Sequence, residues 1–187
     1  MDKNNLTIVR HQFAQCVFNH KVQEKAVERL EKINIKIKWA NIIVLAFVII
    51  FLILQIRYPQ NFIFAGVSIS ITVFEILFLF LQKEFSFEKR SQEHKKVALK
   101  FLELRDKYKN FIVDIVNGLD DAKIVLQRDM FQQQYQIISD IAPQTEYSDY
   151  TNAQKGLFGK INTDEEFTWS DNEIDLFLPN ELRFIKN

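Results

Sequence analysis

One acidic residue stands inside an apolar segment, and it is the residue with the greatest potential for chemistry. Glu75 lies in the run 62–81, whose other polar residues are Ser68, Ser70 and Thr72. An ionisable group deep in a membrane-spanning helix costs about 3 kcal/mol on insertion scales. Glu75 is therefore a candidate functional residue if this run crosses a membrane.

Glu75 belongs to a repeating pattern of small and polar residues. The pattern recurs at alternating spacings of four and three and places these positions on one helical face: Asn61, Ala65, Ser68, Thr72, Glu75, Leu79 and Gln82. Asn41 and Gln55 share a face of the preceding apolar segment. Small residues let membrane helices pack closely, and Glu75 would then hydrogen-bond Asn41 or a partner helix. Alternatively, the face lines a water-filled path in an oligomer, with a ring of Glu75 near its inner mouth.

The sequence does not decide between the packing interpretation and the water-filled path. Both predict the same candidate intramembrane polar residues: Glu75, Thr72, Ser68 and Asn41.

The sequence offers no catalytic or metal-binding motif. It has no phosphate-binding glycine loop, no nucleophile elbow, and no HExxH or CxxC pattern. Cys16 and His20 are one helical turn apart, but His11 lies off their face and a closed zinc site needs four ligands. The adjacent acids at 120–121 and 164–166 suit helix capping and solvation. We therefore expect no enzyme activity, no metal and no cofactor.

Two apolar segments predict a transmembrane helical hairpin that would position Glu75. The first arm runs from Trp39 to Ile56 and is apolar throughout from Ile42 to Leu54. Only the five residues 57–61 separate it from the second arm, 62–81. About 20 helical residues cross the hydrocarbon core, where only helices and closed barrels satisfy their backbones. Trp39 and Tyr58 flank the first arm, as interfacial aromatics do. The alternative, a buried helix pair in a soluble bundle, would need a polar side that 42–54 lacks.

Basic residues are frequent before and after the hairpin and rare in its loop. Six lie within 21–38 and five within 83–96, whereas the loop carries only Arg57. By the positive-inside rule, we expect a multi-pass protein of the inner (cytoplasmic) membrane with both termini in the cytoplasm.

Composition predicts an all-α fold. The chain has 187 residues with only four glycines and three prolines, and abundant helix formers. The balance of 24 basic and 24 acidic residues gives no signal for nucleic-acid binding. A single cysteine, Cys16, fits a reducing compartment. We expect four parts: an amphipathic cytosolic helix at 1–38, the hairpin at 39–82, cytosolic helices at 83–142, and an acidic C-terminal segment, 143–187, docked on the helical bundle.

The cytosolic helices carry an apolar seam, at spacings of three and four residues: Phe101, Leu104, Tyr108, Phe111 and Ile115. Such spacing is typical of coiled coils and predicts a homo-oligomer. The alternative is that the seam packs on residues 9–33 of the same chain. Farther along, 147–150 suggests a polar turn, Gly156 and Gly159 suggest a loop, and Trp169 suggests docking on the helices or on a neighbouring subunit.

The layout resembles the SLATT family of small two-transmembrane proteins. The resemblance rests on the basic first helix, the tight hairpin, and the helix with Phe101, Leu104 and Tyr108. It continues through a family-like segment: Pro143, Thr145, Asp149, Tyr150 and Ala153.

This resemblance implies a membrane effector in a prokaryotic antiviral conflict system. Such proteins are typically encoded beside a nucleotide-signal synthase, a nucleotide sensor or a reverse transcriptase, and permeabilise the membrane to halt the infected cell. The resemblance transfers no catalytic motif. The alternative function is a non-conducting two-pass membrane adaptor that recruits a cytosolic partner.

Overall fold

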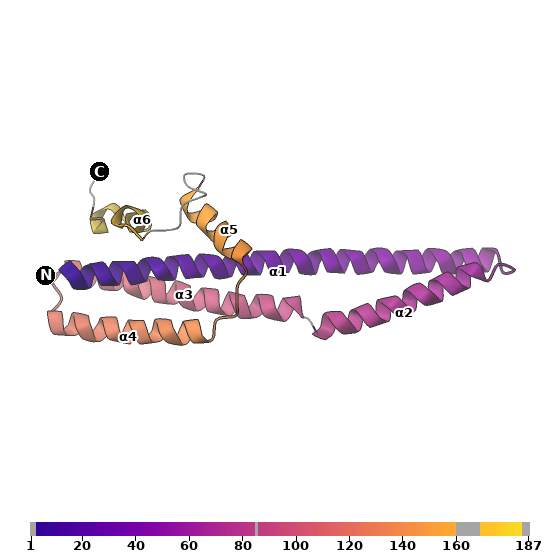
Figure 1. Cartoon of the computed structure of the whole chain (residues 1–187), viewed down its shortest axis with the longest axis horizontal. Coiled ribbons are helices and arrows are strands. Elements are labelled where there is room, and N and C mark those ends of the chain that lie inside the picture. The colour runs from indigo at the N-terminus through magenta and orange to yellow at the C-terminus, as the bar shows by residue number, and fades with distance from the viewer. Residues whose placement is uncertain (1–2, 85, 160–168, 185–187) are drawn as a thin grey trace. The chain divides into compact units, whose positions relative to one another are not determined.

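The computed structural model describes residues 3–84, 86–159 and 169–184, and throughout these ranges the regular structure is helical. Figure 1 shows the elements in chain order: α1 (Lys3–Arg57), α2 (Ile63–Glu84), α3 (Phe87–Val116), α4 (Asp121–Asp140), α5 (Tyr147–Phe158), α6 (Asp171–Asp175) and the 3₁₀ helix η1 (Asn180–Leu182). The chain divides into two compact units, one of residues 1–27 and 92–187 and one of residues 28–91. The predicted all-α class is confirmed.

Helix α1 continues from the charged N-terminal region into the first apolar arm without interruption. It contains 55 residues, none of them glycine or proline. It ends at Arg57, two residues before Pro59, because a proline disfavours helical geometry in the residue before it. The boundary expected at residue 38, between the N-terminal helix and the hairpin, is therefore a change from charged to apolar residues within one continuous helix.

The first unit is built around the N-terminal part of α1 packed with α3 and α4. One apolar cluster joins Leu6, Val9 and Phe13 of α1 to α3 and to Ile124 and Phe131 of α4. Helices α3 and α4 are linked by a tight reversal. Gly118 has a φ of 94°, and the backbone N–H groups of Gly118 and Leu119 donate to the carbonyls of Ile115 and Asp114. This is a Schellman ending, which a glycine adopts without strain.

Two interpretations of the C-terminal third were wrong. Residues 147–150 form the first turn of α5 rather than a polar turn, and Gly156 lies inside that helix. Only Gly159, at φ 67°, ends it. Helix α5 starts with a capping box between Glu146 and Asp149, in which the Glu146 N–H donates to Asp149 Oδ2 at 3.0 Å. The acidic run 164–166 lies outside the described residues.

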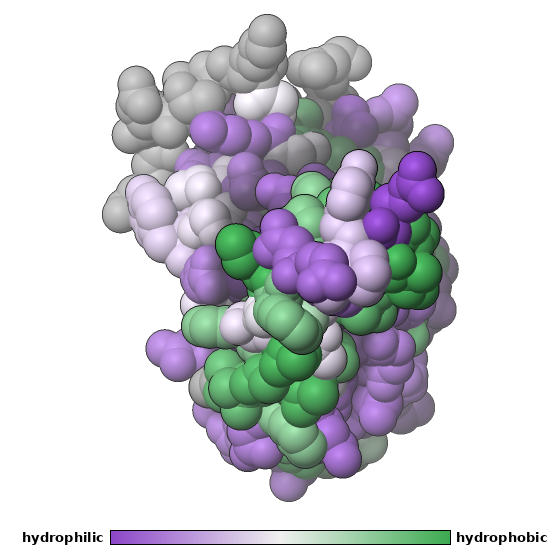
Figure 2. All heavy atoms as spheres, turned by 90° about the vertical axis from the view of Figure 1, so that its right-hand side faces the viewer, coloured by the Kyte–Doolittle hydropathy of each residue, from purple (hydrophilic) through white to green (hydrophobic). Residues whose placement is uncertain are grey.

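The second unit contains the hairpin, and its apolar side chains lie at the surface. Ile43 is 53% exposed and Phe74 is 77% exposed. Figure 2, seen from the side of the hairpin loop, shows many apolar residues in green on that surface. Both arms are long and apolar enough to span a bilayer, and almost none of either span is buried inside the protein. Such exposed apolar surfaces are typical of helices in lipid, and the two arms are candidate membrane spans.

Candidate functional site: an intramembrane carboxylate in the hairpin

Hydrogen bonds made by amide side chains join the two arms at both ends of the hairpin. Near the charged flanks, the amides of Asn41 and Gln82 donate to each other, with both N–O distances at 3.1 Å. Near the loop, Gln55 Oε1 accepts the backbone N–H of Ala65 at 2.9 Å, a group in the first turn of α2 that has no helical partner. These contacts hold α1 and α2 in a fixed register.

The hydroxyl groups of α2 bond to the helix that carries them. Ser68 donates to the Ala65 carbonyl, Ser70 to that of Gly66 and Thr72 to that of Ser68, at 2.8–3.0 Å. This back-bonding satisfies a hydroxyl in an apolar environment. None of these three hydroxyls donates to Glu75 in the structure.

Glu75 is the exception among the polar groups of the hairpin. Its side chain is turned inward and only 6% exposed, and its Oε1 atom is buried without a hydrogen-bond partner. A hollow of about 380 Å³ lies beside it, lined by these residues: Val44, Ser70, Ile71, Phe74, Glu75 and Phe78. A buried polar atom without a partner costs about 1–3 kcal/mol. The arrangement is therefore costly unless a further group completes it.

The structure distributes the four candidate residues over three environments. Ser68 and Glu75 are buried between the arms, one heptad apart, whereas Thr72 is exposed on α2. The packing interpretation allowed a hydrogen bond between Asn41 and Glu75. The structure does not show this bond, because Asn41 is paired with Gln82. The polar face is thus covered in part by α1, and Glu75 is left opposite apolar side chains such as Val44.

The predicted seam lies inside the first unit. All five of its residues are at most 3% exposed and belong to the apolar cluster shared with α1 and α4. Phe131 of α4 packs edge-on against both Tyr108 and Phe111. The seam is therefore occupied within one chain, and burial raises the pKa of the Tyr108 phenol.

The family-like segment builds the contact between α5 and α1. Ala153 is fully buried against Phe18 and Val22, and Tyr150 packs edge-on against Phe18 with ring centroids 5.0 Å apart. Asp149 is 1% exposed and caps α5. Pro143 and Thr145 lie in the connection between α4 and α5. These residues serve packing and capping in the described structure.

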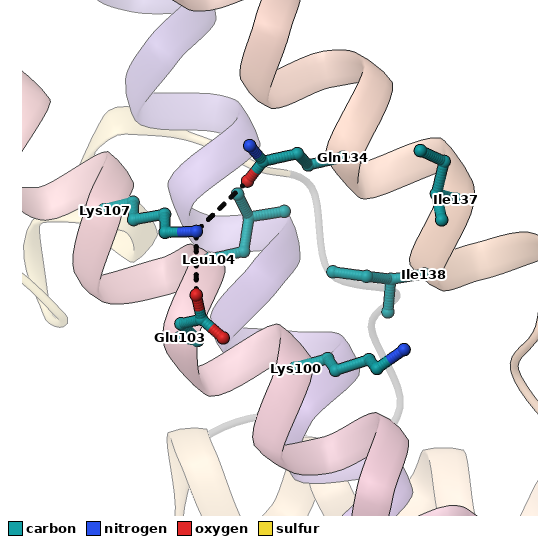
Figure 3. Close-up of a pocket in the computed structure, with 7 residues that line it drawn as sticks. All are labelled: Lys100, Glu103, Leu104, Lys107, Gln134, Ile137 and Ile138. Carbon is teal, nitrogen blue, oxygen red and sulfur yellow. Dashed lines mark hydrogen bonds and ion pairs between the residues drawn. The ribbon is translucent and has the colours of Figure 1, made fainter.

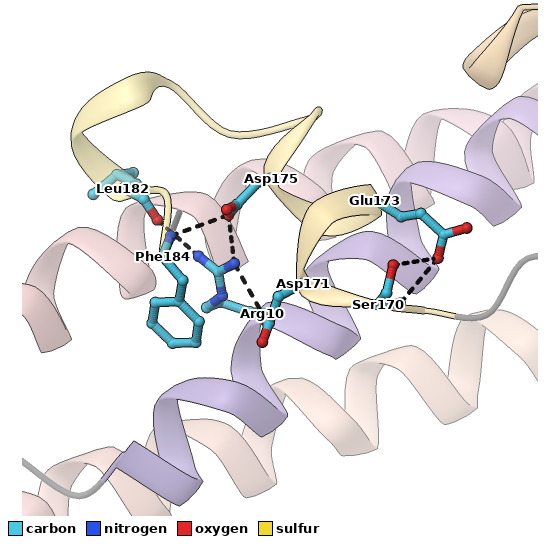
Figure 4. A network of polar contacts seen from close by, with 7 residues as sticks. All are labelled: Arg10, Ser170, Asp171, Glu173, Asp175, Leu182 and Phe184. Atoms are coloured by element: carbon cyan, nitrogen blue, oxygen red, sulfur yellow. Dashed lines mark hydrogen bonds and ion pairs between the residues drawn. The ribbon is translucent and has the colours of Figure 1, made fainter. Parts of the chain in front are cut away.

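Arg10 anchors the C-terminal segment to α1, and the sequence analysis did not single it out. Its guanidinium donates to Asp175 Oδ1 at 2.5 Å and to the Leu182 carbonyl at 2.8 Å, and it lies 3.7 Å from the centre of the Phe184 ring (Figure 4). Arg10 is 1% exposed and Asp175 is 5% exposed. An arginine on the same face as Leu6 and Phe13 was the only signal of this contact in the sequence.

Trp169 also packs against α1. Its ring lies 5.2 Å from that of His11 and 5.9 Å from that of Phe18, measured between centroids. Its φ of 58° is unusual for a bulky residue and costs about 1–3 kcal/mol, which the surrounding contacts must offset. His11 thus has an aromatic neighbour, while His20 Nδ1 bonds the Ala98 carbonyl at 2.9 Å. Within the described ranges, no three His, Cys, Asp or Glu residues converge on a common point.

A second hollow, of about 200 Å³, lies between α3 and α4 (Figure 3). Its central cation, Lys107, donates to Glu103 at 2.8 Å and to Gln134 Oε1 at 3.4 Å. The hydrogen bond from Lys107 lowers the pKa of the Glu103 carboxyl. Because Lys107 already has two partners, this second hollow is typical of an ordinary solvated surface. In this respect it differs from the hollow at Glu75, where a buried polar atom has no partner.

Comparison with known proteins identifies the family. No curated protein and no solved structure is significantly similar to this chain. Residues 6–173 match the SMODS and SLOG-associating 2TM effector domain family 4, and this range contains both candidate spans and the helices packed on α1. The two spans of the structure agree with the two transmembrane segments in that description. The chain therefore belongs to family 4 of the SLATT effector domains.

Proposed function

We propose that this protein oligomerises and permeabilises the inner membrane in an antiviral response that halts the infected cell. Membership of an effector family associated with SMODS and SLOG components supports a role downstream of a nucleotide signal. A separately encoded synthase, nucleotide sensor or reverse transcriptase would control it. No enzyme activity is needed for such an action.

The observation that carries the proposal is the buried, unpartnered carboxyl of Glu75 in a candidate membrane span. We propose that this arrangement, in which Ser68 and Glu75 are buried between the arms, is the closed state. Rotation of α2 away from α1 would expose Ser68, Thr72 and Glu75 to a common water-filled path. Water would hydrate the carboxyl, and the cost of its burial would then favour opening.

A path requires several copies, because two helices cannot enclose one. The seam is buried in the described structure, so contacts between copies through it would need the cytosolic helices to rearrange. The exposed apolar faces of the hairpin remain accessible for such contacts in the closed state. We propose that the hairpins pack together in the membrane, with Asn41 near the inner end of the path.

Ion leak from vesicles tests this function, with the separately encoded signalling component added as the trigger because the untriggered protein is proposed to be closed. Glu75→Gln retains the size of the side chain and removes its ionisable charge, whereas Glu75→Leu removes both charge and hydrogen bonding. If Glu75 lines the path, both variants change leak by about tenfold while the oligomer remains intact. Glu84→Gln, at the exposed end of α2, is the matched control and should behave as the unmodified protein. Silent Glu75→Gln, with Glu75→Leu altering only stability or oligomeric state, would support packing instead.

We also propose that both termini face the cytoplasm. Single cysteines at Gln60, in the loop, and at Gln133, on the exposed side of α4, test this with an impermeant thiol reagent. The native Cys16 is buried and adds little background. Labelling should occur at residue 60 in intact cells and at residue 133 only after permeabilisation. Labelling at residue 133 in intact cells would reverse the topology.

A two-pass adaptor is the second candidate. Exposed apolar side chains on the C-terminal segment favour it, since Leu176 is 62% exposed and Phe184 is 42% exposed. Such residues could recruit a cytosolic partner while the hairpin serves as an anchor. An adaptor would show no leak in any variant, and its function would survive replacement of Glu75 by leucine.

A further inference from the structure

The hollow beside Glu75 combines a single acidic group with apolar walls. Glu75 Oε1 has no partner and the side chain is more than nine-tenths buried, at the edge of a space of about 380 Å³. Phe74, 77% exposed, and Phe78, 42% exposed, form part of its wall. Since both rings reach the lipid-facing surface, the hollow is accessible from the bilayer. Its volume is in the range of pockets that hold small molecules.

The hairpin does not supply the missing donor. The hydroxyls of Ser68, Ser70 and Thr72 donate to backbone carbonyls, and Asn41 and Gln82 satisfy each other. Between residues 39 and 82 the only basic residue is Arg57, which lies at the far end of α1 beside the loop. A second copy would bring the same side chains at the same depth. Within the hairpin as described, no side chain donates to Glu75 Oε1, which leaves the place of a donor open to another molecule.

The lining selects the chemistry of that molecule. An inorganic cation stripped of water needs several oxygen ligands, and the hollow offers one carboxyl and the Ser70 hydroxyl. An organic ammonium ion brings its own N–H donors and an apolar body. Its charge is attracted to the carboxylate and to the faces of aromatic rings, and its body fills the apolar space.

We propose that Glu75 and the adjacent hollow form a binding site for a lipophilic organic ammonium ion that enters from the membrane. The site does not depend on conduction, because binding requires only the hairpin described here. A rotation of the Glu75 side chain toward the hollow would bring its buried Oε1 atom to the ligand, which would then satisfy the carboxyl and hold α2 against α1. Binding is thus measurable whether or not the protein permeabilises membranes.

Binding of 1-adamantylammonium to the full-length protein in lipid nanodiscs tests the proposal. Uptake by protein-free nanodiscs is subtracted, and neutral 1-adamantanol serves as the uncharged analogue. We expect saturable binding of the ammonium ion, at least tenfold tighter than that of the alcohol. Glu75→Gln should weaken ammonium binding at least tenfold, whereas Glu84→Gln should leave it unchanged.

A second pair of variants tests the hollow itself. Val44→Phe fills the space and leaves the carboxyl in place, so ammonium binding should fall at least tenfold. Leu45→Phe, at a neighbouring lipid-exposed position, adds the same ring outside the hollow and should bind normally. Circular dichroism checks that each variant keeps its helical content. Equal binding by the unmodified protein and Glu75→Gln, or equal binding of the ammonium ion and the alcohol, would overturn the site. Saturable binding that depends on Glu75 would uphold the site, and absence of leak from triggered vesicles in the same experiment would contradict the proposed function alone.

Discussion

At the scale of single residues, two amide side chains of the hairpin form a pair whose members depend on each other. Asn41 and Gln82 exchange two hydrogen bonds near the charged flanks of the hairpin. Loss of one partner leaves the other with unsatisfied polar atoms, which costs more than the loss of both. Polar contacts between membrane helices average about 0.6 kcal/mol and reach about 1.7 kcal/mol. The reciprocal geometry places this pair toward the upper end.

Removal of one amide should therefore destabilise the hairpin more than removal of both. We expect Asn41→Leu to lower the free energy of unfolding by about 1.5 kcal/mol and the double variant Asn41→Leu/Gln82→Leu to recover most of that loss. Unfolding of the full-length protein in detergent, followed by circular dichroism, measures both. Additive losses in the double variant would show that the two side chains do not depend on each other.

Cys16 reports on the core of the first unit. The thiol is fully buried, and this burial raises its pKa from 9.0 to about 12. The folded state therefore keeps the proton between about pH 9 and pH 12, whereas the unfolded chain loses it above about pH 9. The contribution of this group to stability is complete below pH 9 and declines as the pH rises through that window.

This burial predicts that Cys16 reacts slowly with thiol reagents. At pH 8 the thiol should react at least a hundredfold more slowly in the native protein than in denaturant. Timed labelling with a maleimide, read by mass spectrometry, measures the ratio. Comparable rates in the two conditions would place Cys16 at an accessible surface and contradict the described core.

At the scale of elements, Arg10 joins the C-terminal segment to α1 by a buried ion pair. Asp175 is its closest acidic partner, while Asp171 lies 3.7 Å away with its side chain 48% exposed. Removal of one member of a buried pair leaves a desolvated charge and costs about 3–5 kcal/mol. Exposed pairs contribute at most about 1 kcal/mol. The two aspartates thus provide a variant and its control on one short helix, α6.

Asp175→Ala should release the segment that carries α6 and η1. We expect faster proteolysis of residues 169–184 and a loss of about 3 kcal/mol, while Asp171→Ala changes stability by less than about 1 kcal/mol. Limited proteolysis with mass mapping follows the release, and chemical denaturation gives the energies. Equal behaviour of the two variants would mean that the buried pair does not hold the segment.

The long elements were predictable from the sequence, because their signals are local. Apolar runs, the absence of glycine and proline from residues 3–57, and the break at Pro59 predict α1 and α2. The start of α5 was missed because its capping box uses Glu146 and Asp149 rather than the usual serine or threonine. The spacing of the seam predicted an apolar face but could not distinguish a partner chain from α1 and α4.

Contacts between distant segments were not predictable in the same way. Arg10 and Asp175 are separated by 165 positions, and no local pattern links them. Glu75 was identified from the sequence because an ionisable group in a membrane-spanning helix is energetically costly. Whether it has a hydrogen-bond partner depends on the register of the two arms, which the sequence does not give. Pairing of Asn41 with Gln82 fixes that register and leaves Glu75 facing Val44 rather than an amide.

At the scale of the whole molecule, the chain combines a core that is complete within one copy with a hairpin whose apolar faces need lipid. The first unit buries its seam, α5 and α6 on α1, α3 and α4 without a second subunit. The hairpin leaves Glu75 without a partner. A first unit that is packed within one chain and a hairpin with an unsatisfied polar atom are consistent with the triggered effector that we propose.

The most direct test of this account is the membrane potential of cells that express the full-length protein together with the genes encoded beside it. A potential-sensitive dye follows the membrane, and growth is recorded in parallel. We expect that, once the system is triggered, depolarisation precedes growth arrest, and that Glu75→Leu, inserted at the same level, delays or abolishes both. A potential that remains intact while growth stops, or triggered cells that neither depolarise nor arrest, would contradict permeabilisation and leave the adaptor function in its place.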